Sequence, residues 1–463
     1  MTRYKHFILL ILMFALFAVV SPVITFYVQG YRFDFKEMSF FRTGGMYLQT
    51  TPKKARIFLN DKALKNGTPL LINGLLPKNF HVKITKENFY PWEKYIKIES
   101  GLVNEAKNII LVPDKISENL LFSPAIKLYS SPSGNYGLTI AENDNDIVMI
   151  NKEKRRSINL QNAYQKEQIA YALKNNQTAW ADNETKIIAY YKHDNYILDF
   201  SEQTITHFFI KKSELKKSDA DGFIQPLQAQ WHPTIDNSVL FIYDGRLYAY
   251  DLRDKKSSIL TDNAIYYKTV SLTLNSYVYY MGNLGLIRKY NFITQNNEKL
   301  SEVPLNYNNG DELLIAPDQK KIAFFDKKNR KLFLMSNGDI KIINDADFAQ
   351  FASDSKKILY GNKNKVWVFF MEDDNEYPEK RRGTTEELAS SDNGDINNAF
   401  WRAPDNRHLW IAANDLYFTE LDNRPPRNTY TILNNISSDI FINENEIYYL
   451  RGNDLYYSDV FPQ

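Results

Sequence analysis

Hydrophobic positions along the chain follow three successive patterns, and the first is an unbroken apolar run without charge over residues 7–28. A helix of this length spans about 33 Å, enough for the ~30 Å hydrocarbon core of a bilayer. Pro22 interrupts one backbone hydrogen bond, which membrane helices tolerate. The pattern therefore predicts a transmembrane helix within residues 1–30.

This first segment is interpreted as an uncleaved signal anchor. The rival interpretation is a cleaved signal peptide, whose apolar core is shorter and ends at a small-x-small site, whereas here the apolar run continues past Ala18 to Val28. Aromatic residues follow where the headgroup layer is expected. They are Tyr27, Tyr31, Phe33 and Phe35.

Basic residues near the helix do not decide its orientation, because they stand on both sides of it. Those before it are Arg3 and Lys5, and those after it are Arg32, Lys36 and Arg42. The short basic start, the long apolar run and the absence of an acidic residue before Asp34 resemble an export signal. We expect the body of the protein to be extracytoplasmic.

The second pattern is a period-two alternation that begins at Met46, after a juxtamembrane connector over residues 31–45 that ends in two glycines. Residues 56–60, 81–85 and 95–99 each place apolar side chains on one face, and turn signals separate them. These strands predict a small β-sandwich over residues 46–113.

Residues 46–113 resemble the PEGA domain, a small β-sandwich of surface-associated prokaryotic proteins. The matching residues are Thr51-Pro52, Ala55, Ile57, Leu59-Asn60-Asp61, Gly67-Thr68-Pro69-Leu70, Leu75-Leu76-Pro77 and Asn88-Phe89-Tyr90-Pro91-Trp92. The chain departs from the family at Lys78-Asn79, where Pro-Gly is usual, and at Phe89-Tyr90, where Gly-Tyr is usual. Asparagine tolerates a left-handed backbone, so both departures are expected to keep the turn geometry.

The third pattern is a repeat that fills residues 114–463. Each copy has a polar turn, an apolar strand, a polar hairpin tip and a second apolar-aromatic strand. Copies begin at Ser131, Ala181, His232, Thr273, Ala316, Ala352, Ala403 and Ile442. Units of this length cannot bury both of their faces alone, so the repeat predicts a closed β-propeller.

The turn phrases of the repeat, such as Ala-Pro-Asp at 316–318, resemble those of TolB-like and WD-repeat-like propellers. The copies predict eight blades, or seven if the degenerate copy at Thr273 is not a true repeat. The last copy ends before a fourth strand, while the stretch 118–129 precedes the first copy. We expect this early stretch to complete the last blade and close the ring.

Composition supports an all-β fold and removes several classes of function. Aromatic residues make up 14% of the chain, which favours strands. The net charge of +2 gives no electrostatic reason to expect nucleic acid as a partner, and the lack of cysteine excludes disulfides and thiolate chemistry.

The chain lacks the common catalytic and nucleotide-binding motifs. No Gly-x-Ser-x-Gly elbow, phosphate loop or dinucleotide fingerprint is present. The histidines lack metal-ligand spacing; they are His6, His81, His193, His207, His232 and His408. Acidic turns at 143–146 and 392–395 lack the glycine and glutamate of a calcium loop, so solvated hairpin tips are the better interpretation. Trp180, Trp231 and Trp401 are expected to pack between blades.

Two stretches are longer than ordinary connections, and long loops on rigid rings often bind ligands. They are residues 201–229, with Lys211-Lys212 and Lys216-Lys217, and residues 372–398, with Glu379-Lys380-Arg381-Arg382. A disordered insertion is the alternative for each.

These observations together predict a non-catalytic, membrane-anchored cell-envelope protein that carries no cofactor. The PEGA-like module would act as a surface spacer or adhesion module, and the propeller would bind an envelope protein or polysaccharide. One alternative is a propeller hydrolase or lyase with carboxylates converging on the central channel. Another is a structural subunit of an envelope assembly.

Overall fold

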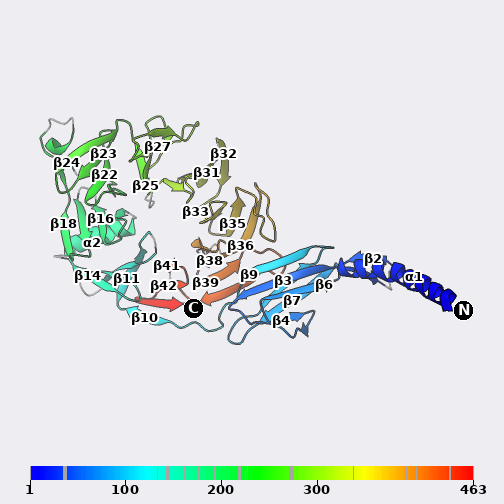
Figure 1. Cartoon of the computed structure of the whole chain (residues 1–463). Helices are drawn as coiled ribbons and strands as arrows, with labels where there is room; N and C mark the ends of the chain where they lie inside the picture. Colours follow the sequence, from blue (N-terminus) through cyan, green and yellow to red (C-terminus); the bar gives the residue numbers. More distant parts are fainter. Residues whose placement is uncertain are drawn as a thin grey trace. The chain divides into compact units, whose positions relative to one another are not determined.

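The structure is a computed structural model that describes residues 2–34, 39–132, 134–141, 146–160, 163–175, 177–191, 194–216, 221–224, 226, 228–270, 276–336, 338–392, 395–402, 404–436 and 439–461 (Figure 1). Helix α1 (Thr2–Val28) contains the predicted apolar run. Its segment His6–Val28 is long and apolar enough to cross a membrane, and none of it is buried in the protein. The predicted N-terminal apolar helix is confirmed.

The chain folds into two compact units, and two segments of the repeat region belong to the first. Unit 1 contains Met1–Ile116, Asp373–Arg381 and Phe418–Tyr430, and unit 2 contains Ser117–Glu372, Arg382–Tyr417 and Thr431–Gln463. After α1 the chain forms a hairpin of β1 (Tyr31–Asp34) and β2 (Ser39–Arg42). The predicted connector is therefore an ordered hairpin over most of its length.

Two sheets form the sandwich of unit 1 and share one hydrophobic core. One sheet has the order β6-β3-β9, with β3 (Gly44–Thr51), β6 (Leu70–Leu75) and β9 (Val103–Ile110). The other has the order β5-β4-β7-β8, with β4 (Arg56–Leu59), β5 (Lys62–Ala63), β7 (Asn79–Thr85) and β8 (Trp92–Lys97). Met46 and Ala106 of the first sheet pack with Val82 and Trp92 of the second. The predicted small sandwich is confirmed.

Backbone geometry agrees with only one of the two asparagine expectations. Asn88 takes a φ of +65°, as expected for a left-handed turn. Asn79 does not, because it is the first residue of β7 and has extended backbone there. The expectation of a left-handed Asn79 is wrong.

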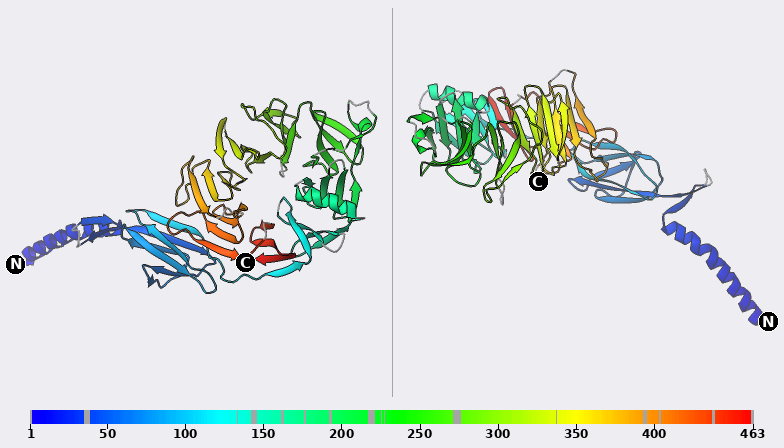
Figure 2. Two further views of the ribbon diagram at one scale, coloured as in Figure 1. Left: turned by 180° about the vertical axis from the view of Figure 1, so that it is seen from behind. Right: turned by 90° about the horizontal axis from the view of Figure 1, so that it is seen from above.

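Eight four-stranded sheets form a ring within the described residues of 119–459 (Figure 2, left). The first sheet consists of β11 (Ala125–Ser130), β12 (Gly137–Ala141), β13 (Asp146–Ile150) and β14 (Arg155–Asn159), and the second of β15 (Thr178–Trp180), β16 (Lys186–Tyr191), β17 (Asp194–Asp199) and β18 (Thr204–His207). The third consists of β21 (Gln230–Trp231), β22 (Ser238–Tyr243), β23 (Arg246–Asp251) and β24 (Lys256–Thr261), and the fourth of β25 (Tyr266–Val270), β26 (Tyr277–Met281), β27 (Ile287–Asn291) and β28 (Asn297–Lys299).

The other four sheets complete the ring. They are β29 (Glu312–Ile315), β30 (Lys321–Asp326), β31 (Lys331–Ser336), β32 (Asp339–Asn344); β33 (Phe348–Phe351), β34 (Lys357–Gly361), β35 (Lys365–Phe370), β36 (Thr385–Ser390); β37 (Asn398–Trp401), β38 (His408–Ala412), β39 (Leu416–Glu420), β40 (Thr429–Leu433); and β10 (Asn119–Phe122), β43 (Asp454–Asp459), β42 (Glu446–Arg451), β41 (Ile440–Asn443). Each sequence repeat corresponds to the two central strands of one sheet.

The ring closes as predicted, because a strand from the start of the repeat region completes the last sheet. Strand β10 pairs antiparallel with β43, so the first strand of the repeat region is the outer strand of the last sheet. The stretch 118–129 also contains β11, which opens the first blade and contacts β41 and β42. Leu128 and Val148 of the first blade share a core with Phe441 and Tyr448 of the last. Eight blades and their closure are confirmed.

The recurrent turn phrase has a structural cause. In three blades an aspartate accepts a hydrogen bond from the backbone N–H two residues on and contacts the basic side chain three residues on. The pairs are Asp318 with Lys321 (2.7 Å), Asp354 with Lys357, and Asp405 with His408 (3.0 Å). Burial raises the pKa of Asp405, but its contacts with His408, the backbone N–H of Arg407 and the charge of Arg402 together outweigh burial and lower that pKa to about 2.

Helix α2 (Ala163–Lys174) is absent from the sequence prediction. It lies between the first two blades and buries Ile169, Ala172 and Leu173, an i, i+3, i+4 set, in their common core. The long stretch 201–229 contains β18, a small sheet of β19 (Ile210–Lys211) and β20 (Phe223–Ile224), and a short 3₁₀ turn (Lys212–Glu214). The stretch 372–398 supplies β36.

Several sequence interpretations fall on residues that lie outside the described part. They concern Phe35, Lys36, Asn143, Asp144, Asn145, His193, Lys217, Asn393 and Gly394. The side chains of Arg3 and Lys5 also lie outside it.

Candidate functional site

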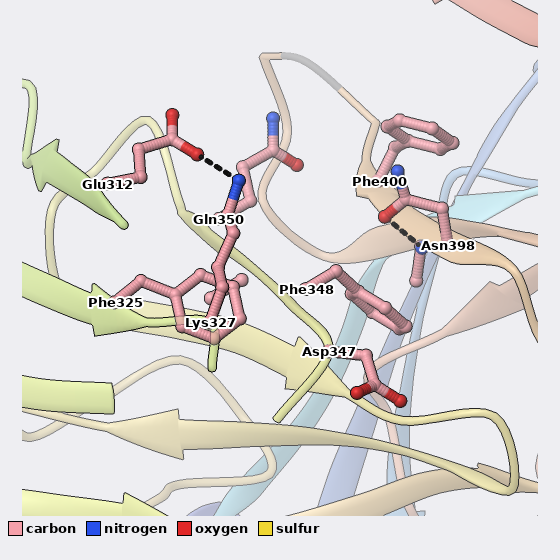
Figure 3. Close-up of a pocket in the computed structure, with 10 residues that line it drawn as sticks. Glu312, Phe325, Lys327, Asp347, Phe348, Gln350, Asn398 and Phe400 are labelled. Carbon is pink, nitrogen blue, oxygen red and sulfur yellow. Dashed lines mark hydrogen bonds and ion pairs between the residues drawn. The ribbon is translucent and has the colours of Figure 1, made fainter. Parts of the chain in front are cut away.

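The candidate site is a pocket of about 290 Å³ in unit 2, lined by the first strands of three successive blades (Figure 3). Glu312 opens β29, Phe348 and Gln350 belong to β33, and Asn398 and Phe400 belong to β37. Phe325 and Lys327 come from the end of β30 and the turn after it. The pocket is therefore made by sheet strands, which hold their side chains more rigidly than loops do.

Three phenylalanine rings supply the apolar lining of this pocket. Phe325 is buried, while Phe348 and Phe400 are partly exposed. When an apolar ligand group covers partly exposed rings in a concavity, their apolar surface is removed from water, and this burial stabilises the complex.

Two side-chain amides present hydrogen-bond donors among these rings. Gln350 Oε1 accepts from Trp401 N at 3.1 Å, and Asn398 Oδ1 accepts from Ala399 N at 2.8 Å. Because backbone N–H groups can only donate, these contacts fix which amide atom is oxygen. Among the described residues Gln350 Nε2 and Asn398 Nδ2 have no hydrogen-bond partner, so both NH₂ groups can donate to a ligand.

The charged groups of the pocket are all paired, either with one another or with neighbouring residues outside the lining. Glu312 lies 3.1 Å from Lys327 Nζ and 3.8 Å from Lys268 Nζ, and Asp347 accepts from Arg330 Nε at 2.6 Å. Each of these side chains is about one third to one half exposed, so water screens the pairs. The pocket offers no uncompensated charge in the described part of the chain.

Hydrogen bonds and neighbouring charges shift several carboxyl pKa values in the described part of the chain. The carboxyl groups whose pKa departs from its ordinary value are all shifted downward, and they are Glu93, Asp199, Asp251, Asp405 and Asp422. A general acid needs a raised carboxyl pKa. Among the same residues, no group of three or more His, Asp or Glu side chains is placed to hold a metal ion.

The tryptophans lie between blades, as expected. Trp231 and Trp401 are buried, and their indole Nε1–H groups donate to backbone oxygens of the preceding blade, Ala179 at 3.2 Å and Gln350 at 3.2 Å. Trp180 is half-buried against the core between the first two blades. Trp401 ties the pocket strand β37 to β33, and none of the three tryptophans lines the pocket.

The described histidines are distributed over helix α1, strands and one loop. His232 is buried against Phe292, and its Nδ1 accepts from the backbone N–H groups of Thr234 and Ile235. His81 lies 3.4 Å from Glu93, and His207 lies 3.3 Å from Asp194. His6 lies in α1.

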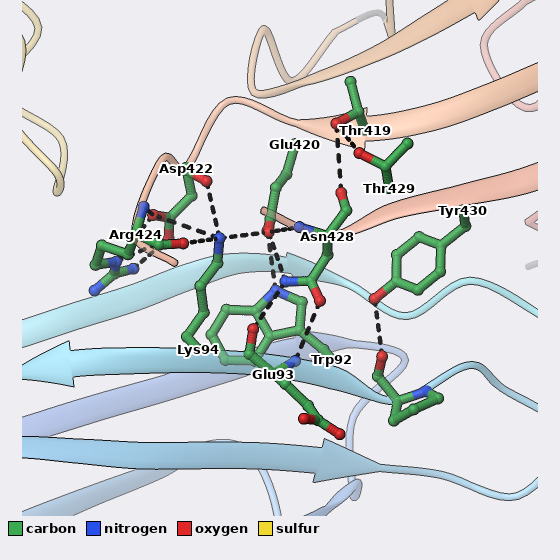
Figure 4. A network of polar contacts seen from close by, with 11 residues as sticks. Trp92, Glu93, Lys94, Thr419, Glu420, Asp422, Arg424, Asn428, Thr429 and Tyr430 are labelled. Carbon is green, nitrogen blue, oxygen red and sulfur yellow. Dashed lines mark hydrogen bonds and ion pairs between the residues drawn. The ribbon is translucent and has the colours of Figure 1, made fainter. Parts of the chain in front are cut away.

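A second polar cluster lies in unit 1 (Figure 4). Its buried charged groups are hydrogen-bonded to one another and to backbone oxygens, so they are not available to a ligand. The ammonium of Lys94, a fully buried residue of β8, donates to Glu420 Oε1 at 2.7 Å and to the backbone oxygens of Asp422 and Arg424 at 2.8 and 2.7 Å. Glu420 Oε2 accepts from Trp92 Nε1 at 2.9 Å. We call this cluster the Lys94 clasp.

The Lys94 clasp fastens residues 418–430 along β8. Tyr95 N donates to Pro425 O at 2.7 Å. The side chain of Asn428 bonds both the N–H and the C=O of Glu93, at 3.2 and 3.1 Å, as a neighbouring strand would. The segment thereby covers the hydrogen-bonding edge of the sheet, which would otherwise be open to pairing with another chain.

The pocket residues were not found from the sequence. Gln350 in FAQF and Asn398 in NAFW are amides inside otherwise apolar first strands, and this was the available signal. The three strands are about 36 to 50 residues apart in the sequence, so only the ring brings them together.

Comparison with known proteins does not identify the chain. No family model and no curated protein matches it. A solved structure described as the crystal structure of the eukaryotic initiation factor is 12% identical, with 80% of this chain and 96% of that chain covered and a TM-score of 0.46. A likeness of this size supports no argument about function, which therefore depends on the pocket and the helix.

Proposed function

We propose that this protein is a non-catalytic, membrane-anchored cell-envelope protein whose propeller binds a segment of a partner protein in the Gln350–Asn398 pocket. Helix α1 would be its single-pass anchor, with the body extracytoplasmic. The PEGA-like sandwich would be the surface module that carries the propeller.

The pocket is the observation that carries this proposal. Its rings suit an apolar or aromatic anchor side chain of the kind that dominates protein interfaces. The two amide NH₂ groups suit the backbone carbonyls on either side of such an anchor. Ion pairs engage the charged groups of the pocket, so two amides are its remaining hydrogen-bonding side chains among the described residues, and this small number favours a protein segment over a polysaccharide with many hydroxyls.

Photo-crosslinking in native membranes tests the proposal. A benzoylphenylalanine at Phe400 of the full chain is expected to give one discrete protein adduct, and Gln350→Ala together with Asn398→Ala is expected to abolish it. The matched control places the same probe at Phe223, which is 60% exposed in unit 2.

Three results bear on the proposal. An adduct at Phe400 that persists in the double variant, or equal labelling from both positions, would contradict it. Protection of the Phe400 probe by envelope polysaccharide without any protein adduct would assign the pocket to a glycan.

A further inference from the structure

One end of the sandwich exposes a cluster of apolar side chains. Strand β3 begins where β6 ends and where β9 begins, because Gly44 pairs with Leu75 and Gly45 pairs with Val103. At this end Leu76 is 40% exposed, Leu102 is 58% exposed and Val103 is 50% exposed. One exposed leucine is ordinary, whereas three apolar side chains on neighbouring turns indicate a contact surface. We call Leu76, Leu102 and Val103 the apolar end.

A short series of hydrogen bonds connects the apolar end to the end of helix α1. The β1/β2 hairpin returns the chain to its start, so that Tyr31 pairs with Arg42. Thr43 then donates to Gly30 O through its backbone N at 2.8 Å and through its Oγ1 at 2.9 Å. Gly101 N donates to Thr43 O at 3.1 Å, so two hydrogen-bonded steps join the end of α1 to the turn that carries Leu102.

Aromatic rings also cluster where α1 meets the β1/β2 hairpin. Phe40 of β2 is 69% exposed and lies 6.4 Å from Phe26 of α1 and 5.0 Å from Phe33, measured between ring centroids. The guanidinium of Arg32 lies 3.7 Å from the centre of the Tyr27 ring. Exposed aromatic rings with arginine are typical of the bilayer interface.

The charges around the apolar end suit anionic lipid headgroups. Hydrogen bonds to backbone oxygens around it bring in the basic residues Arg42, Lys78 and Lys97 and the acidic residue Glu99. Ser100 Oγ donates to Arg42 O, Ile98 N to Lys78 O, Asn104 Nδ2 to Lys97 O and Leu102 N to Glu99 O. The Arg42 side chain lies against Gly101, where an added Cβ would come within 2.9 Å of its guanidinium nitrogen. Basic residues at a membrane surface are attracted by anionic lipid.

We propose that the apolar end is a second membrane contact, seated in the headgroup layer of the leaflet where α1 ends. The proposal rests on the proposed anchor role of α1. Each headgroup layer is about 5–7 Å thick. Neighbouring strands lie about 5 Å apart, so the turn, two hydrogen-bonded steps from the helix end, lies within about 10 Å of it and its long side chains reach that layer. Leu76, Leu102 and Val103 insert there and hold the sandwich against the bilayer.

Site-specific fluorescence tests this contact, since the chain has no cysteine and a single introduced one is unique. The full chain is reconstituted in vesicles of phosphatidylcholine and phosphatidylglycerol and labelled with an environment-sensitive dye at Leu102→Cys. The control in the same sandwich is Leu71→Cys, which is 49% exposed further along β6. Phe14→Cys in α1 reports the anchor itself.

The expected result is a blue-shifted emission at Leu102→Cys, with quenching by lipids that carry a headgroup quencher and none at Leu71→Cys. Leu76→Asp with Val103→Asp is expected to remove that quenching. Quenching of Phe14→Cys by deep lipid quenchers, together with water-like, unquenched emission at Leu102→Cys, would overturn this inference alone. Unquenched emission at Phe14→Cys would overturn both the inference and the proposed anchor.

Discussion

Replacing Lys94 with methionine removes the cation that pairs with the buried carboxylate of Glu420 in the Lys94 clasp. The side chains of Lys94 and Glu420 are 0% and 8% exposed, so water cannot take the place of the ammonium. Leaving one member of a buried ion pair without its partner costs about 3–5 kcal/mol. We expect this cost to appear as local opening of residues 418–430 from β8.

Hydrogen exchange is the suitable assay, because it reports the opening of one segment in a protein of more than one unit. The informative amides are Tyr95 N–H, bonded to Pro425 O, and Asn428 N–H, bonded to Glu420 Oε1 at 2.9 Å. A cost of 3–5 kcal/mol corresponds to exchange faster by about a hundredfold to a few thousandfold in Lys94→Met.

A matched control and a double variant separate the ion pair from general effects. Lys97→Met makes the same change at an exposed position of β8, and we expect it to alter exchange by less than about threefold. Lys94→Met with Glu420→Gln removes both charges and is expected to recover about 2 kcal/mol relative to the sum of the single variants. Unchanged exchange in Lys94→Met, or additive effects in the double variant, would refute the assigned role of the pair.

Three further predictions concern unit 2. Burial lowers the pKa of His232 to about 4, so the unfolded chain takes up the proton first as pH falls from about 6.5. The free energy of unfolding should then decrease by about 3 kcal/mol by pH 4, and His232→Asn should flatten this dependence in denaturant titrations at several pH values. Trp401→Phe loses the hydrogen bond to Gln350 O and should lower the free energy of unfolding by about 1 kcal/mol in the same titrations. A decrease of less than about 0.3 kcal/mol would contradict the assigned role of this hydrogen bond. Deleting residues 454–459 removes β43 from between β42 and β10 and exposes the edges of both strands. Calorimetry should then show a lower unfolding temperature, and light scattering should show aggregation. An unchanged unfolding transition would contradict ring closure.

Much of the fold could be predicted from local patterns. The charge-free run of α1, the alternation in β7 and the repeated turn with its aspartate each record a local physical constraint. The closure of the ring also followed, because a last copy without a fourth strand needs a partner and the stretch 118–129 supplied one.

The rest depends on contacts between residues far apart in the sequence. Nothing local to residues 418–430 shows that Glu420 will meet Lys94, more than 300 positions earlier. The two pocket amides stand in two different blades, and an isolated glutamine in an apolar strand is as often a structural residue. Helix α2 was missed because its apolar set is short and lies inside a chain of strands.

Labelling of a single cysteine at Leu284 tests the central claim most directly. This residue is 71% exposed in unit 2, and the chain has no other cysteine. A membrane-impermeant maleimide is added to intact cells, and the labelled protein is then measured in membranes washed at alkaline pH. The account predicts full labelling in intact cells and retention in the washed membranes. Labelling only after lysis, or release by the wash, would contradict it.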